Sequence, residues 1–148
     1  YSLYNLYRFA HYYEEAYGKY IWLKSGASLV IEHTEAMTVI DVNTGSVLKK
    51  KKQEDTLFYQ INREAAKEIA RQLRLRNISG IIMIDFINMK DTAQKEKLLS
   101  LLDSECKKDR VHCNVIDMTA LNLVEMTRSK VRKPLHEQIR SCMKNNRS

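Results

Sequence analysis

The chain lacks any apolar run long enough to cross a bilayer, and no signal-peptide pattern opens it. Its three cysteines, Cys106, Cys113 and Cys142, show no paired framework, which argues against a disulfide-built scaffold and fits reduced thiols in a cytoplasm. No internal repeat is present, and a run of four lysines is the one low-complexity segment. The chain begins at Tyr1 without an initiator methionine, so we expect it to be a piece of a longer protein.

The composition is that of an ordinary globular protein with excess positive charge. The length of 148 residues suits one domain with a real core, and 44% apolar and 29% charged residues are usual values. Lys and Arg number 25 against 18 Asp and Glu, which gives a net charge of +7. Such an excess attracts polyanions. A solvated surface that is merely basic explains the charge equally well.

The apolar spacing predicts an α/β fold with a mixed sheet and flanking helices. Helices are predicted over 2–17, over 55–76, and from a capping box of Asp91 and Gln94 to about 106. Strands are predicted at 21–23, 28–32, 36–42, 81–85, 113–116 and 123–126. The strand at 81–85 is apolar almost throughout, which is typical of a strand covered on both faces.

The first predicted helix is rich in tyrosine, and two interpretations of it stay open. Exposed tyrosines stack on nucleic-acid bases. The alternative, which we favour, is a helix that packs on the sheet or on a partner. The six tyrosines of this region are Tyr4, Tyr7, Tyr12, Tyr13, Tyr17 and Tyr20.

Two aspartates, Asp41 and Asp85, end two of the predicted strands, and a helix lies between them in the sequence. That order predicts two parallel strands, whose carboxyl ends meet at one edge of the sheet. Paired carboxylates repel unless a proton or a cation lies between them, and Mg²⁺ prefers oxygen ligands. Asn43 follows Asp41 by two positions and points the same way on a continued strand. Simple capping of loops or helices is the alternative role for the two aspartates.

Four segments of the sequence resemble the bacterial ribonuclease E/G family. Glu35 to Gly45 carries the motif around Asp41 and Asn43, and Ile84 to Ile87 carries Asp85. The other two segments are Asn62 to Arg76 and Leu123 to Arg128. The segments occur in the family's order, and the resemblance extends from about Trp22 to Leu135.

The resemblance implies a deoxyribonuclease-I-like catalytic subdomain of an endoribonuclease that cuts single-stranded RNA in the cytoplasm. It implies that Asp41 and Asp85 bind Mg²⁺, with Mn²⁺ as an alternative, and that Asn43 supports the site by hydrogen bonding. We therefore expect an N-terminal helix at 1–18, the catalytic subdomain at 19–135 and a basic tail at 136–148. A homo-oligomer stays open.

Basic residues are the candidates for contacts with RNA phosphates. Arg128 is favoured because it lies in a family segment, and Lys130 keeps the charge of an arginine that is usual in the family. The remaining candidates are Arg110, Lys49, Lys50, Lys51 and Lys52. For the four consecutive lysines, an ordinary solvated loop is at least as good an interpretation.

The family's zinc-binding Cys-Pro-x-Cys link is reduced here to Cys142-Met143-Lys144-Asn145. One cysteine cannot supply the usual ligands, so we predict no structural zinc, with a ligand set that includes His136 as the alternative. The S1 and 5′-sensing modules of the family are also absent from this sequence, so we expect the chain alone to be weak or inactive on RNA.

Three other functions remain alternatives. The first is a non-catalytic RNA-binding or scaffolding remnant of the family. The second is a two-carboxylate phosphatase or deoxyribonuclease. The third is a structural subunit whose first helix forms an interface.

Overall fold

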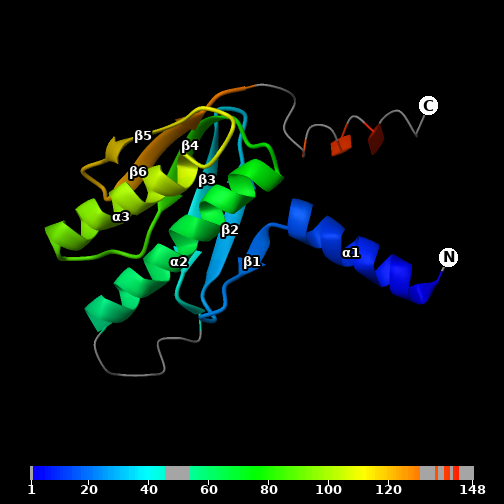
Figure 1. The fold of residues 1–148 in the computed structure, drawn as a ribbon, viewed down its shortest axis with the longest axis horizontal. Coiled ribbons are helices and arrows are strands. Elements are labelled where there is room, and N and C mark those ends of the chain that lie inside the picture. Colours follow the sequence, from blue (N-terminus) through cyan, green and yellow to red (C-terminus); the bar gives the residue numbers. More distant parts are fainter. Residues whose placement is uncertain (1, 46–53, 131–135, 137–138, 141, 144–148) are drawn as a thin grey trace.

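The computed structural model describes residues 2–45, 54–130, 136, 139–140 and 142–143, and confirms the α/β class with a mixed sheet and flanking helices. Along the chain (Figure 1) the elements are α1 (Leu3–Tyr17), β1 (Tyr20–Trp22), β2 (Ser28–His33), β3 (Met37–Asn43), α2 (Glu54–Leu75), β4 (Gly80–Asp85), α3 (Thr92–Cys106), β5 (Cys113–Met118) and β6 (Leu123–Arg128). The lysine run at 49–52 lies outside the described residues.

The described strands form one six-stranded sheet in the order β1-β2-β3-β4-β6-β5. Among them β3 and β4 are the parallel pair, and every other neighbouring pair is antiparallel. Parallel neighbours need a crossover connection, and α2 lies between β3 and β4 in the chain. The predicted strand–helix–strand unit is therefore confirmed at the centre of the sheet.

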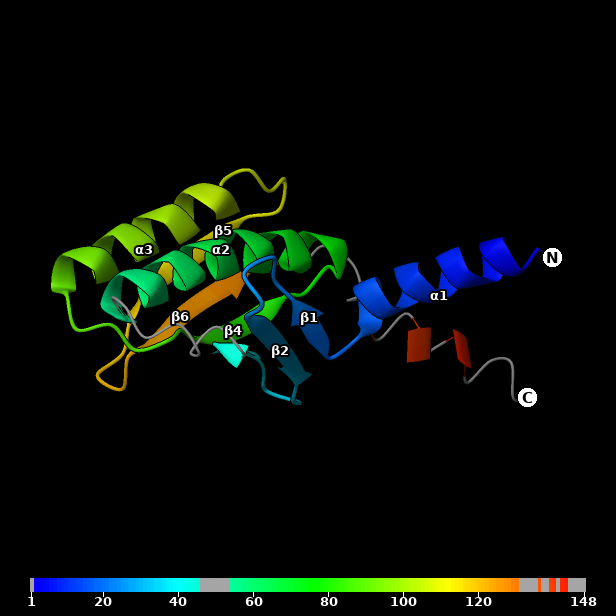
Figure 2. The same ribbon diagram turned by 90° about the horizontal axis from the view of Figure 1, so that it is seen from below.

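Helices α2 and α3 cover one face of the sheet (Figure 2). The buried stripe of α2 contains Ile61, Ala65, Ile69 and Leu73, as its i, i+4 spacing predicts. Full burial of a Leu or Ile side chain contributes about 1.5–3 kcal/mol. The facing residues of α3 are Leu98, Leu102 and Cys106, which are also buried. The core lies between these two helices and the sheet.

The opposite face of the sheet is not covered by any helix of the described residues (Figure 2). Along β3, Thr38, Ile40 and Val42 are buried towards the helices, whereas the alternating residues are half-buried or exposed. On β4, Ile81 is 49% exposed. The prediction that this strand is covered on both faces is therefore wrong. The prediction fails because the uncovered face of β4 also carries apolar residues, Ile81 and Met83. A continuous apolar run therefore does not show whether one face of a strand is covered or both.

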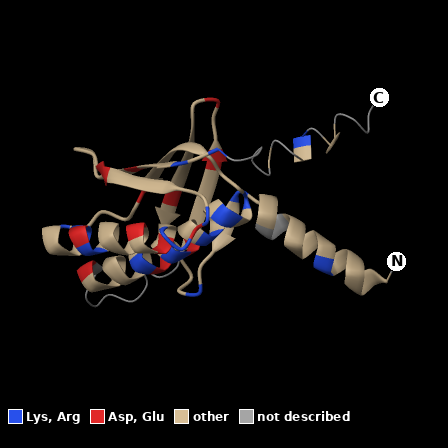
Figure 3. Cartoon of the chain, turned by 45° about the horizontal axis from the view of Figure 1, so that its top comes forward, with Lys and Arg blue, Asp and Glu red and all other residues tan. Residues whose placement is uncertain are grey.

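Helix α1 projects away from the sheet (Figures 1 and 2). Leu3 is 84% exposed and Tyr7 81% exposed, so α1 does not pack on the sheet as one interpretation of its tyrosines required. Its attachment lies at its end, where Arg76 donates a hydrogen bond to the Gly18 carbonyl oxygen at 2.6 Å. Most of α1 is neutral, whereas α2 and α3 carry charges of both signs (Figure 3).

The capping box predicted for α3 is formed only in part. Asp91 is the N-cap, and its carboxylate accepts a hydrogen bond from the Ala93 backbone N–H at 2.8 Å. The Gln94 side-chain oxygen is buried and has no hydrogen-bond partner, so the reciprocal half of the box is missing. No helix within the described residues has the length and apolar character that crossing a membrane requires.

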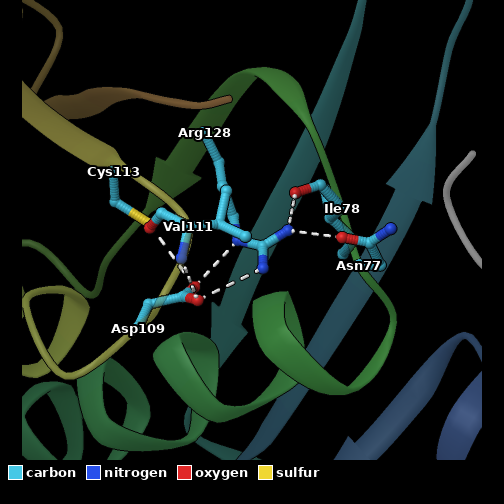
Figure 4. A network of polar contacts seen from close by, with 6 residues as sticks. All are labelled: Asn77, Ile78, Asp109, Val111, Cys113 and Arg128. Carbon is cyan, nitrogen blue, oxygen red and sulfur yellow. Dashed lines mark hydrogen bonds and ion pairs between the residues drawn. The ribbon is translucent and has the colours of Figure 1, made fainter. Parts of the chain in front are cut away.

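A buried ion pair ties three segments together at one end of β4 (Figure 4). Arg128, on β6, donates from Nε to Asp109 Oδ2 at 2.8 Å, and the two side chains are 3% and 6% exposed. Its Nη1 donates to Asn77 Oδ1 at 2.9 Å and to the Ile78 carbonyl oxygen at 3.0 Å. Nη2 donates to Asp109 Oδ1 at 3.4 Å. The guanidinium thus joins β6, the loop after α3 and the turn before β4.

The Asp109 carboxylate is held in its charged form by this network. Burial raises its pKa, but hydrogen bonds from Arg128 and from the Val111 backbone N–H, with the charge of Arg128, outweigh burial and lower the pKa below its usual value. Because the folded pKa is lowered, the contribution of Asp109 to stability is present above about pH 4, the unfolded value. It is lost as the pH falls through the lower, folded pKa.

Replacing Arg128 by alanine should destabilise the fold by about 3–5 kcal/mol, because it leaves the Asp109 carboxylate buried without its counter-charge. Chemical denaturation at neutral pH measures the loss. The matched control is Arg110→Ala, which removes an exposed arginine next to Asp109 in the loop after α3 and should change stability by no more than about 0.5 kcal/mol. Equal stability of the two variants would contradict the structural role assigned to Arg128.

Candidate functional site

The two aspartates predicted to meet do occupy paired positions on neighbouring strands. In the parallel register of β3 and β4, Met37 is paired with Ile81 and Asp41 with Asp85. Paired residues of neighbouring strands point to the same face, and the strands lie about 4.8 Å apart. Asp41 is half-buried and Asp85 exposed, both on the face that the helices leave uncovered. The site therefore lies on the open face of the sheet, at the carboxyl end of its parallel pair.

The carboxylate pair has apolar neighbours in its row across the sheet. Val30 of β2 pairs with Asp41, and Leu123 of β6 pairs with Asp85. Burial raises the pKa of the Asp85 carboxyl, and the negative charge of Asp41 raises it further. The two carboxylates thus interact electrostatically and repel when both are ionised. A cation or a shared proton between them relieves that repulsion.

Asn43 is the last residue of β3, lies on the same face as Asp41 and is exposed. The chain turns sharply just after it, because Gly45 has a φ of +59°. A Cβ built on Gly45 would lie 2.5 Å from the Gly26 carbonyl oxygen, so no larger residue fits without moving the backbone. The glycine of this Asn-Thr-Gly segment thereby lets the β1–β2 turn pack against the end of β3, next to Asn43.

Sequence reasoning missed Asn62, which fixes the backbone just after Asp85. Asn62 is fully buried on α2, and its Nδ2 donates to the Ile87 carbonyl oxygen at 2.8 Å. Its Oδ1 accepts from the Ile87 backbone N–H at 3.0 Å. One side chain thus satisfies both polar groups of Ile87, two residues beyond Asp85. The signal was available, since Asn62 is a polar residue beside the apolar stripe of α2 and within a family segment.

Of the basic residues predicted to bind RNA, the three that the structure describes, Arg110, Arg128 and Lys130, are not gathered at the aspartates. Arg128 pairs with Gly80 at the start of β4, whereas Asp85 pairs with Leu123 at its end. These positions are five residue steps apart along the strand, or about 16 Å. Arg110 and Lys130 are exposed near the Arg128 end. Arg128 itself is 4% exposed and bound within the fold, so this structure gives it a structural role and leaves its guanidinium little access to a phosphate.

The donors present suit one particular kind of metal ion. Within the part of the chain that the structure describes, no group of three or more His, Cys, Asp or Glu side chains is placed to hold a metal. The pair of Asp41 and Asp85 offers two carboxylates and no nitrogen or sulfur ligand. Mg²⁺ binds through one or two carboxylates and keeps several waters, so these residues fit it.

Together these observations define a class of protein: an α/β domain that presents two aspartates and an asparagine on the uncovered face of a mixed sheet. Comparison with known proteins then gives the family. The sequence model of the Ribonuclease E/G family matches residues 1–131, and the chain belongs to this family.

Individual relatives agree with this assignment. Ribonuclease G of Escherichia coli (strain K12) is 45% identical over 122 residues, which are 82% of this chain and 25% of the relative. Ribonuclease G of Haemophilus influenzae is 47% identical over 122 residues, which are again 82% of this chain and 25% of the relative. Ribonuclease E of Nostoc sp. is 42% identical over 115 residues, which are 78% of this chain and 17% of the relative. The chain thus spans about a quarter or less of the length of these relatives.

Replacing Asn62 by alanine should destabilise the fold by about 2–3 kcal/mol, because the two polar groups of Ile87 lose their partner in a buried site. Hydrogen exchange should show the largest loss of protection at residues 86–89. Denaturation and exchange of Gln60→Ala, an exposed position on the same helix, give the matched control. Unchanged exchange at Ile87 in the Asn62 variant would contradict the positioning role.

Replacing Asp41 by asparagine should lower the pKa of Asp85 towards its usual value, because the charge that helps to raise it is removed. In the wild type the folded state binds the Asp85 proton more tightly than the unfolded state does. Stability from this group is therefore greatest below the usual carboxyl pKa and is lost as the pH rises through the raised value.

Carboxyl-carbon NMR titration without divalent cations measures the shift in the pKa of Asp85. Glu32→Gln is the matched control, since it removes an exposed carboxylate from the same face, on β2. The Asp85 titration should not move in that variant. An equal response to Glu32→Gln and Asp41→Asn would mean that Asp41 has no special coupling to Asp85.

Proposed function

We propose that this chain is the catalytic subdomain of a Mg²⁺-dependent endoribonuclease that cleaves single-stranded RNA. The observation that carries the proposal is the parallel register of Asp41 with Asp85 on an open face of the sheet. Membership of the ribonuclease E/G family supports the reaction class. The deoxyribonuclease-I-like comparison made from the sequence is consistent with a mixed sheet that has two helices on one face.

In this proposal the carboxylates of Asp41 and Asp85 would hold Mg²⁺, or Mn²⁺ in its place. When bound, such a cation lowers the pKa of a coordinated water and polarises a phosphate oxygen. The residues of the chain hold the cation and orient the substrate. Asn43 lies on the same face and can donate a hydrogen bond from its amide to a group at the pair. Asn62 keeps the segment after Asp85 in place.

The open face provides the room that an extended polymer substrate needs. A strand of RNA can lie across the sheet without entering a closed pocket, which suits cleavage inside a chain rather than at its end. Arg110 and Lys130 are exposed at the far end of the sheet and are proposed as contacts with more distant phosphates. A cytoplasmic location is part of the proposal, and it is supported by three cysteines without disulfides.

The chain alone should cleave RNA slowly, since it matches about a quarter of the length of the ribonuclease G relatives. The proposed catalytic residues lie within the chain, but the chain matches only part of each relative, and the unmatched part can supply further contacts with the substrate. Slow metal-dependent cleavage is therefore the expected result, rather than none.

The decisive experiment follows cleavage of a labelled single-stranded RNA with Mg²⁺, with Mn²⁺ and with EDTA. Cleavage should require the divalent cation and should fall by about 100-fold or more in the variant that carries both Asp41→Asn and Asp85→Asn, as for loss of a main electrostatic group. The matched control is Asp117→Asn, which removes an exposed carboxylate from β5 and should cleave like the wild type.

Two outcomes would contradict the proposal. Cleavage that survives both substitutions would place the reaction elsewhere. RNA binding without any metal-dependent cleavage by the wild type would favour a non-catalytic RNA-binding or scaffolding role. A gel-shift measurement on the same samples distinguishes that second outcome from a protein that simply does not bind RNA.

A further inference from the structure

Strand β1 exposes two aromatic side chains that do not pack into the core. Tyr20 is 61% exposed and Trp22 is 73% exposed, whereas Ile21 between them packs against the core. Leaving large rings in water forgoes the free energy that their burial would contribute. An exposed tryptophan next to a candidate site therefore calls for a ligand that covers it.

The sheet register places both rings on the face that carries the aspartates. Tyr20 pairs with Val30, which in turn pairs with Asp41. Trp22 pairs with Ser28, which pairs with Asn43. Two strand spacings separate β1 from β3, or about 10 Å. The rings are thus within reach of bases that flank a phosphate bound at the carboxylate pair.

A groove of about 890 Å³ runs between β1 and α2, and charged residues make up half of its lining. Its two acids are already engaged, since Glu64 accepts from the Ser25 backbone N–H, and Glu68 accepts from Arg71 and Gln72. The exposed cations of the groove are Lys24, Lys67, Arg71 and Arg74, of which Arg71 is paired with Glu68. The border of the aromatic strand is therefore positively charged.

Aromatic rings beside a basic groove are the combination by which proteins bind single-stranded nucleic acid. A protein partner is the other ligand that buries Tyr and Trp, but the cores of protein interfaces are depleted of charge. The charged lining of this groove, which meets Tyr20 and Trp22 at the β1 edge of the sheet, favours a polyanion with stacking bases over a protein surface.

We propose that Tyr20 and Trp22 form a stacking platform for the bases of single-stranded RNA, with Lys24, Lys67 and Arg74 along its phosphate backbone. The inference rests on the proposed function, because it assigns the platform to the substrate of the carboxylate site. Stacking is tolerant of sequence, since every base has an aromatic face. The platform therefore selects single strands over duplexes, whose bases are already stacked on one another.

Trp22 is the single tryptophan of the chain, so its fluorescence reports on the platform directly. The probe is a mixed-sequence single-stranded oligoribonucleotide, added in EDTA so that no metal-dependent cleavage occurs. Saturable quenching of the indole emission is expected. The same oligonucleotide annealed into a duplex should quench much less.

Substitutions then separate stacking from general attraction. Trp22→Ala should raise the Kd for the single strand, measured by anisotropy of a labelled oligonucleotide, by about tenfold, and Trp22→Phe should keep most of the affinity. Lys67→Gln should weaken binding and reduce the slope of log Kd against log salt by about one. The matched control is Ile116→Ala on β5, which removes an exposed apolar side chain from the opposite edge of the sheet and should leave the Kd unchanged.

The outcomes separate the platform from the catalytic proposal. The double variant Asp41→Asn, Asp85→Asn should lose cleavage but keep the fluorescence quenching. Quenching without cleavage by the wild type would overturn the catalytic proposal and leave the platform standing. Cleavage with the same Kd in the wild type and in Trp22→Ala would overturn the platform alone. Protection of Trp22 from iodide that grows with protein concentration, without RNA, would assign the rings to a protein contact instead.

Discussion

The parallel pairing of β3 with β4 is the constraint on which the candidate site depends. A shift of one residue in that register would move every side chain of one strand to the other face, and Asp41 and Asp85 would no longer share a face. Burial favours this register, because the buried stripe of α2 and the apolar side chains that alternate with the aspartates belong to one hydrophobic core. Burial of the core therefore also brings together two charges that repel each other.

Two polar clusters fix β4 from its opposite ends. At its start, Arg128 binds Asp109 and the turn at Asn77 and Ile78, and just beyond its end Asn62 binds Ile87. A buried ion pair contributes little net stability compared with apolar packing of the same volume, but breaking one is costly. The value of these contacts lies in geometry, because they hold the strand that carries Asp85 in one position against its neighbours. A site that must bind a small cation with two carboxylates needs such rigid support.

Much of this arrangement could be predicted from the sequence, because apolar periodicity reports elements and their order. Asp41 and Asp85 were paired by the strand–helix–strand order alone, and the structure confirms that their strands are parallel neighbours. Which face of the sheet is covered could not be predicted, since Ile81 and Met83 read as buried residues although they lie on the open face. The roles of Arg128 and Asn62 depend on contacts between segments distant in sequence, which the pattern of one chain does not report. From its charge and its family segment, Arg128 is a candidate for a phosphate contact. Only its contacts with Asp109, Asn77 and Ile78 show that it is bound within the fold.

The measurement that tests the central claim most directly is paramagnetic broadening by Mn²⁺ of the backbone amide signals of the labelled chain. A small amount of Mn²⁺ should broaden the amides around Asp41, Asn43 and Asp85 first, and excess Mg²⁺ should restore them. The amides around Arg128, at the other end of β4, should stay sharp. Broadening centred elsewhere, or no selective broadening at all, would show that the paired aspartates do not form the metal site.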